Sequence, residues 1–175
     1  VKGILVGKNT AEQDNPSLTV RLTKNDLGLK KSEIIEQPVK IILGNLKKSQ
    51  KVSRIFTGNS KIIIGSRQPA KKSKNIEYLK YEKKNFLEEF LKDLLDRNIS
   101  SILVEGGQKT LNAFIVNNLF DELVLYTAPM FLGKESKDAV SINAPDSIKT
   151  SMKLKMVSQE RFKDDIKITY YNINI

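Results

Sequence analysis

Residues 86–128 alternate between helix-type and strand-type hydrophobic patterns, and this alternation restricts the fold more than any other feature of the chain. One helix face is formed by Phe86, Leu87, Phe90, Leu91, Leu94 and Leu95, and a second by Leu111, Phe114, Ile115 and Leu119. Asn85 is expected to cap the first helix. Strand-like apolar runs follow the two helices at 101–105 and 122–128. This order predicts a parallel strand pair joined by a right-handed crossover.

The rest of the chain contains further strand-like segments, and the hydrophobic pattern changes near its end. Strand-like segments occur at 3–7, 38–43, 61–65, 76–80, 152–162 and 166–174. Polarity alternates along the last two segments, and Lys163-Asp164-Asp165 between them is a turn sequence, which predicts an antiparallel hairpin. We therefore expect an α/β fold with a mixed, mostly parallel sheet flanked by helices. A length of 175 residues fits a single domain over 1–175.

The absence of histidine and cysteine excludes several kinds of chemistry. Disulfides, thiolate zinc sites, thiol nucleophiles and imidazole bases need residues that this chain lacks, and we expect no metal site. Any proton transfer must use a carboxylate, lysine, tyrosine, water or the ligand itself. The apolar runs are too short to span a membrane. A cytoplasmic location is expected, and the lack of cysteine is compatible with it.

The net charge of +10 raises the hypothesis of nucleic-acid binding. The lysines are scattered over loops and polar strand faces, and no helix carries a continuous basic face. This distribution is typical of a solvated surface, so we expect no nucleic-acid partner.

Two polar loops follow apolar strands and are candidates for a functional site. Glu105-Gly106-Gly107 ends the strand at 101–105 and leads into a helix, and residues 7–21 follow the first strand. Glycine suits a tight strand-to-helix turn, and Asx-Pro sequences suit turns, so both loops have a purely structural interpretation. The alternative is a ligand site, because open α/β sheets bind ligands beyond the carboxyl ends of their strands.

The stretches ILVGKNTAEQDNPSLTVR (4–21) and ILVEGGQKTLNAFIVNNLFDELVLYTAPMFLG (102–133) resemble the reductase of riboflavin biosynthesis. In bacteria this family is usually the C-terminal half of a bifunctional pyrimidine deaminase–reductase, and the resemblance covers essentially the whole chain. It implies a dihydrofolate-reductase-like fold and NADPH as cofactor. We also expect a homodimer. The implied reaction reduces the ribosyl group of 5-amino-6-(5-phosphoribosylamino)uracil to a ribityl chain. The resemblance also implies that the family's first strand and helix precede Val1, and it allows a zinc deaminase domain further upstream.

The resemblance assigns roles to individual residues. Asp14 and Glu105 are the implied catalytic carboxylates, and Glu105 also contacts substrate. Leu18 and Arg21 contact substrate, with the Arg21 guanidinium on its 5′-phosphate. The implied cofactor-binding residues are Thr10, Asp14, Asn45, Gly107, Gln108, Lys109, Thr110, Leu111, Asn112 and Ala113. Lys48 and the Ser66-Arg67 pair are two alternative partners for the 2′-phosphate of the cofactor. In the family view, the glycines leave room for the pyrophosphate at the start of a helix.

Several alternatives remain open from the sequence. Gly44-Asn45 stands where the family often has Asp-Ser, which weakens the assignment of Asn45. Asp121-Glu122 fits a structural role at a strand start better than a catalytic role. A related reductase would act on the diaminopyrimidine ribosyl phosphate or on a pterin. An alternative of another class is a non-catalytic basic domain that binds nucleotides or nucleic acid.

Overall fold

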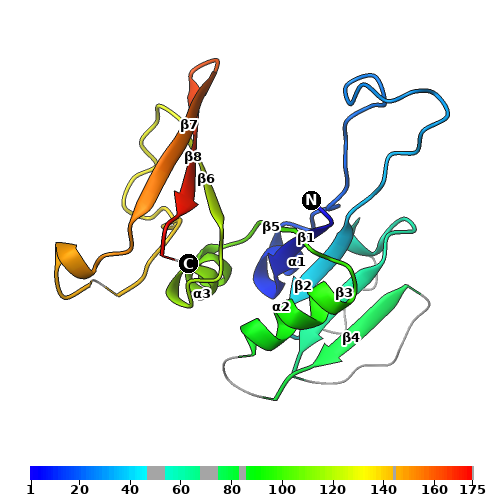
Figure 1. Ribbon diagram of the computed structural model, residues 1–175, viewed down its shortest axis with the longest axis horizontal. Helices are drawn as coiled ribbons and strands as arrows, with labels where there is room; N and C mark the ends of the chain where they lie inside the picture. Colours follow the sequence, from blue (N-terminus) through cyan, green and yellow to red (C-terminus); the bar gives the residue numbers. More distant parts are fainter. Residues whose placement is uncertain (47–53, 68–74, 83–85, 144, 175) are drawn as a thin grey trace. The chain divides into compact units, whose positions relative to one another are not determined.

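The computed structural model describes residues 1–46, 54–67, 75–82, 86–143 and 145–174 (Figure 1). The chain forms two compact units, Val1–Thr110 and Leu111–Ile175, and each unit has its own sheet. Asn85 and Lys48, which the sequence suggests as a helix cap and a cofactor contact, lie outside the described residues. None of the helices in the described ranges combines the length and the apolar character that a membrane crossing requires.

The first unit contains a five-stranded parallel sheet with the strand order β4-β3-β2-β1-β5. Its strands are β1 (Gly3–Gly7), β2 (Val39–Leu43), β3 (Ile62–Ser66), β4 (Ile76–Lys80) and β5 (Ile102–Val104). Between them lie α1 (Lys8–Gln13), the 3-10 turn η1 (Arg54–Phe56) and α2 (Leu87–Asp96). In the centre of the sheet, Leu5 of β1 pairs with Ile41 on one side and with Val104 on the other.

Apart from the buried Lys40 in β2, the central strands are apolar on both faces, as is usual for parallel sheets with covered faces. The residues Leu5, Val6, Ile41, Ile42, Ile63 and Ile64 are at most 1% exposed. Phe90 of α2 packs against β3 at Gly65, where an added β carbon would lie 2.8 Å from the Phe90 ring. Glycine at this position therefore allows α2 to approach the sheet closely. The predicted helix is confirmed, although Leu95 lies outside its buried face and is 59% exposed.

The second unit contains a three-stranded antiparallel sheet with the order β6-β8-β7. Its strands are β6 (Glu122–Thr127), β7 (Leu154–Phe162) and β8 (Asp165–Asn172), and a short 3-10 turn η2 (Ile148–Thr150) precedes β7. The predicted C-terminal hairpin is thus confirmed as β7 and β8. Helix α3 (Gln108–Val116) begins in the first unit and continues into the second.

The α/β class and the parallel sheet are confirmed, but one predicted strand pair is wrong. Residues 101–105 and 122–128 were expected to form a parallel pair within one mixed sheet. Instead, β5 pairs with β1, and β6 pairs antiparallel with β8. The alternation of helices and strands along the chain does not define which strand pairs with which other strand in a sheet. β8 offers β6 an antiparallel register from Glu122–Tyr171 to Thr127–Ile166, whereas β5 spans only Ile102–Val104.

Candidate active site

The carboxyl ends of the parallel strands meet at one edge of the sheet in the first unit. β1 lies between β2 and β5 in the sheet. Along the chain, β2, β3 and β4 are added on one side of β1, and β5 is then added on its other side. The edge beyond β1 and β5 is therefore a topological switch point, which is where open α/β sheets bind ligands. Thr10 follows β1 and Gly107 follows β5, so two of the predicted site residues lie at this point.

A hydrogen bond at the switch point joins α1, which occupies the first part of the expected loop 7–21, to the turn between β5 and α3. The backbone N–H of Gly107 donates to Oγ1 of Thr10 at 3.1 Å. Thr10 lies there because α1 begins directly after β1. Gly107 lies there because the Glu105 N–H extends the pairing of β5 by donating to the Leu5 carbonyl at 2.9 Å. Since the Thr10 oxygen accepts the bond from Gly107, its O–H is a donor that can serve a ligand.

Three glycines at this edge have different surroundings. A β carbon on Gly7 would collide with Oγ1 of Thr110, and one on Gly106 would lie 3.1 Å from the Thr110 Cβ. These two glycines let the start of α3 approach the end of β1. Among the described residues, a β carbon on Gly107 would meet only Oγ1 of Thr10, at an ordinary contact distance of 3.7 Å. The packing of the protein therefore does not require glycine at 107, and its bare backbone fits the close approach of a phosphate group.

The turn that follows α1 holds the predicted catalytic Asp14. Its N–H donates to the Thr10 carbonyl at 3.0 Å and closes the helix, while its side chain is exposed. Asn15 and Leu18 have positive φ angles of 46° and 49°, which are uncommon for residues other than glycine. The Leu18 side chain is 5% exposed and belongs to a buried cluster with Val6 and Ile42. Its side chain thus contributes to the core of the unit.

Arg21 and Glu105 are both exposed. Glu105 follows β5 directly, whereas Arg21 lies in the segment between α1 and β2. Within the described residues, no hydrogen bond or ion pair joins the two side chains. Their predicted meeting on one substrate is therefore a hypothesis about the bound state.

Asn45 connects the ends of β2 and β3 at the same edge of the sheet. It follows Gly44, whose φ of +116° is a conformation that favours glycine. The Asn45 Oδ1 accepts hydrogen bonds from the Ser66 hydroxyl and, at 3.2 Å, from the backbone N–H of Arg67. Asn45 therefore orients the start of the loop that carries the exposed Arg67.

The predicted cofactor-binding residues of α3 fall in both units. Gln108, Lys109 and Thr110 belong to the first unit, and Leu111, Asn112 and Ala113 belong to the second. The Thr110 N–H already donates to the Gly107 carbonyl at 2.9 Å. The Asn112 side chain is also engaged, because its Nδ2 donates to the Ser141 carbonyl and its Oδ1 accepts the Ser141 N–H at 3.0 Å. Asn112 thus holds the segment before β7, a role that the sequence analysis missed.

A lysine buried inside the first unit was also missed by the sequence analysis. Lys40 in β2 is 0% exposed, and its ammonium donates to the carbonyls of Ile55 at 3.0 Å and Thr57 at 2.9 Å. Burial lowers the pKa of Lys40, because the charged form loses hydration. The signal in the sequence is a single charge within the apolar run Val39–Leu43.

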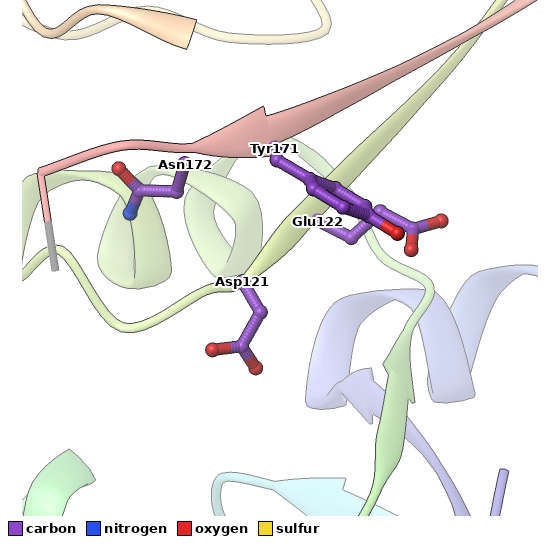
Figure 2. Close-up of a pocket in the computed structure, with 4 residues that line it drawn as sticks. All are labelled: Asp121, Glu122, Tyr171 and Asn172. Atoms are coloured by element: carbon purple, nitrogen blue, oxygen red, sulfur yellow. The ribbon is translucent and has the colours of Figure 1, made fainter. Parts of the chain in front are cut away.

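A hollow of about 290 Å³ lies in the second unit, lined by Asp121, Glu122, Tyr171 and Asn172 (Figure 2). The Asn172 Nδ2 donates to the Asn118 Oδ1 at 2.8 Å and to the Phe120 carbonyl at 2.9 Å. The Asp121 carbonyl accepts the Asn172 N–H at 2.9 Å. Of the residues predicted to bind cofactor or substrate, none lines this hollow. The backbone bond of Asp121 agrees with the structural role favoured for Asp121-Glu122.

The sequence matches a family model described as the RibD C-terminal domain over residues 1–168. The chain belongs to this family. The riboflavin biosynthesis protein RibD of Haemophilus influenzae is 29% identical over 173 residues, which cover 95% of this chain and 46% of that protein. A protein of Buchnera aphidicola subsp. Acyrthosiphon pisum, named 5-amino-6-(5-phosphoribosylamino)uracil reductase, is 29% identical over 94% of this chain and 84% of that protein.

A solved structure supports the fold assignment of the RibD C-terminal domain family. Acinetobacter baumannii RibD superposes on 98% of this chain and 47% of its own chain with a TM-score of 0.83, at 19% identity. At that identity the likeness concerns the fold alone. The chain spans about half the length of the RibD proteins that it matches.

Proposed function

We propose that this chain is a reductase domain that uses NADPH to reduce the ribosyl group of 5-amino-6-(5-phosphoribosylamino)uracil to the ribityl product. Membership of the RibD C-terminal domain family and the name of the Buchnera relative support the reaction and its substrate. The observation that carries the proposal is the hydrogen bond between Gly107 and Thr10 at the switch point, beside a backbone that has room for a ligand.

The residues around this bond fit the pyrophosphate of a dinucleotide. The first turn of a helix presents backbone N–H groups and partial positive charge, and α3 begins directly after Gly107. The backbone of Gln108 and Lys109 and the Thr10 hydroxyl are the groups that would hold the phosphates. When bound, NADPH supplies the hydride for the sugar carbon. Asn112 contributes less than the resemblance implies, because its side-chain amide already holds Ser141.

The carboxylates of Asp14 and Glu105 are the proposed proton carriers for the opened ribosylamine. In a chain without histidine and cysteine, carboxylates are among the groups left for proton transfer, together with lysine, tyrosine, water and the ligand itself. Both side chains are exposed; Asp14 lies in the turn after α1, and Glu105 directly follows β5. Arg21 is proposed to bind the 5′-phosphate through two parallel N–H bonds. Leu18 supports this segment from the core, although a direct contact with substrate is also proposed.

The adenosine end of NADPH is proposed to lie toward β2 and β3. Asn45 fixes the backbone of Arg67 there, and the exposed guanidinium can pair with the 2′-phosphate. This contact would select NADPH over NADH. Lys48 is the alternative partner from the sequence.

Assembly, location and domain organisation remain parts of the proposal. We expect one reductase domain over 1–175 that forms a homodimer in the cytoplasm, with no metal and no nucleic acid bound. Analytical ultracentrifugation of the full-length protein measures the assembly.

Binding measurements separate this proposal from a nucleic-acid-binding domain. The full-length protein is titrated with NADPH, with NADH and with single- and double-stranded DNA at two salt concentrations. The proposal requires saturable NADPH binding and no DNA binding at physiological salt. Salt-dependent DNA binding without NADPH binding would contradict it, because such binding is dominated by phosphate contacts.

A further inference from the structure

The turn after α1 contains two residues in a backbone conformation that is uncommon for residues other than glycine. Asn15 and Leu18 have φ angles of 46° and 49°, and they follow Asp14 within four positions. Such residues persist where the surrounding structure holds them, and they cluster at functional sites. Leu18 is held by its buried side chain. Asn15 has a different support.

The Asn15 side chain is bound to a segment far along the chain. Its Oδ1 accepts the backbone N–H of Arg54 at 2.7 Å, across 39 residues of sequence. Arg54 begins η1, and this turn is closed by the Thr57 N–H and hydroxyl, which donate to the Arg54 carbonyl at 3.1 and 2.7 Å. The position of Asn15 therefore depends on the position of η1.

The segment from η1 to Thr57 is in turn anchored by Lys40. The ammonium donates to the carbonyls of Ile55 and Thr57, and among the described residues no carboxylate forms an ion pair with it. Ile55 itself is 1% exposed and packs in the same buried cluster as Leu18. A charge buried without a counter-ion is costly, so its retention by two carbonyls points to a positional task.

We propose that Asn15 is a positioning residue, which ties the turn carrying Asp14 to η1, and that Lys40 fixes η1 on β2. This connection, from Lys40 through η1 to Asn15, is called the brace. The brace sets where the Asp14 carboxylate stands relative to the substrate. The inference rests on the proposed function, because it assigns Asn15 a role through Asp14.

The hydrogen bond between Asn15 and Arg54 can be removed by substituting either residue. Asn15→Gly keeps the positive φ and removes the acceptor, whereas Asn15→Asp keeps an oxygen acceptor and tolerates the same backbone. Arg54→Pro removes the backbone N–H at the first position of a turn, where proline is tolerated. Arg54→Ala keeps this N–H and removes only the side chain, so it is the reference for Arg54→Pro. Asn98→Gly is the matched control, since Asn98 has a φ of 62° and lies at the end of α2.

We expect Asn15→Gly to lower kcat roughly 10- to 100-fold, the range that a misplacement of about 1 Å produces. The Kd for NADPH should stay within about twofold. The melting temperature should fall slightly further than in Asn98→Gly, because Asn15→Gly also removes a hydrogen bond. Asn15→Asp should restore most of the turnover. The double variant Asn15→Gly/Arg54→Pro should lose no more than the stronger single variant, because both changes delete one bond.

Hydrogen exchange of the Arg54 amide tests the brace without any activity assay. The amide should be protected in the wild type and in Asn98→Gly, and should exchange faster in Asn15→Gly. Equal exchange in all three proteins would overturn the brace. Faster exchange with unchanged kcat would overturn the positioning role. Should the wild type fail to turn over substrate, the proposed function and the positioning role fall together, while the exchange rates still decide whether the brace exists.

Discussion

Replacing Gly107 with alanine separates the two roles that glycine can have where a strand turns into a helix. A β carbon at 107 would lie 3.7 Å from Oγ1 of Thr10, and Gly107 is not among the glycines with positive φ. The folded protein therefore accommodates alanine, and the substitution restricts the unfolded chain. We expect the free energy of unfolding to stay equal or to rise by up to about 1 kcal/mol.

The same methyl group should impair cofactor binding. It would occupy the space in front of the backbone that is proposed to face the pyrophosphate. Losing one charge-assisted hydrogen bond costs about 1.5–3 kcal/mol, which corresponds to roughly a 10- to 100-fold rise in the Kd for NADPH. Gly107→Val should raise the Kd further, because the branched side chain is larger. Fluorescence titration gives the Kd, and urea unfolding gives the stability.

Gly7→Ala is the matched contrast, because its β carbon would collide with Thr110 inside the protein. Overpacking of this kind costs about 1–3 kcal/mol of stability. The reasoning is refuted if Gly107→Ala binds NADPH like the wild type. It is also refuted if Gly107→Val unfolds the protein while the folded fraction binds NADPH normally, since glycine at 107 would then be structural.

Three further predictions concern other residues of the first unit. Arg67→Ala should reduce the preference for NADPH over NADH, measured as the ratio of their Kd values. If wild type and variant have the same ratio, Arg67 does not bind the 2′-phosphate. Arg21→Ala should raise the KM for phosphorylated substrate and hardly change the KM for a dephosphorylated one. Glu105→Gln should reduce kcat more than NADPH affinity. Loss of NADPH binding in both variants would contradict the assignment of these residues to the substrate. Burial lowers the pKa of Lys40 below its ordinary value of 10.5, so the unfolded chain binds more protons between the lowered pKa and 10.5. The stability of the wild type relative to Lys40→Met should therefore rise with pH in that window, measured by urea unfolding, and a constant difference would show that Lys40 is not buried as a cation.

Local sequence patterns predicted the elements of this fold and part of its site. The apolar runs at 3–7, 38–43 and 61–65 are strands, and the structure places β1, β2 and β3 at those positions. Gly107 and Thr10 could be singled out because polar residues and glycines after buried strands lie at one edge of a parallel sheet. Their hydrogen bond joins the two segments, although residues 8–13 form the helix α1 and not the expected polar loop. Their role toward a cofactor stays a prediction.

What the sequence did not predict depends on contacts between distant segments. The neighbour of residues 122–127 is β8, and periodicity describes the faces of a strand but not its partner. Asn15 lies in an ordinary turn sequence and Asn112 has an implied cofactor role, yet their side chains bind Arg54 and Ser141 far along the chain. The partners of Lys40 are backbone carbonyls, which leave no mark in a pattern of side chains.

The most direct measurement is turnover by the full-length protein with NADPH and 5-amino-6-(5-phosphoribosylamino)uracil. NADPH oxidation is followed by absorbance, and the product is identified by mass spectrometry. The account predicts that one NADPH is consumed for each ribityl product formed, and that neither is observed without substrate. NADPH oxidation only with the diaminopyrimidine ribosyl phosphate would contradict the proposed substrate, and no oxidation with either compound would contradict the proposed function.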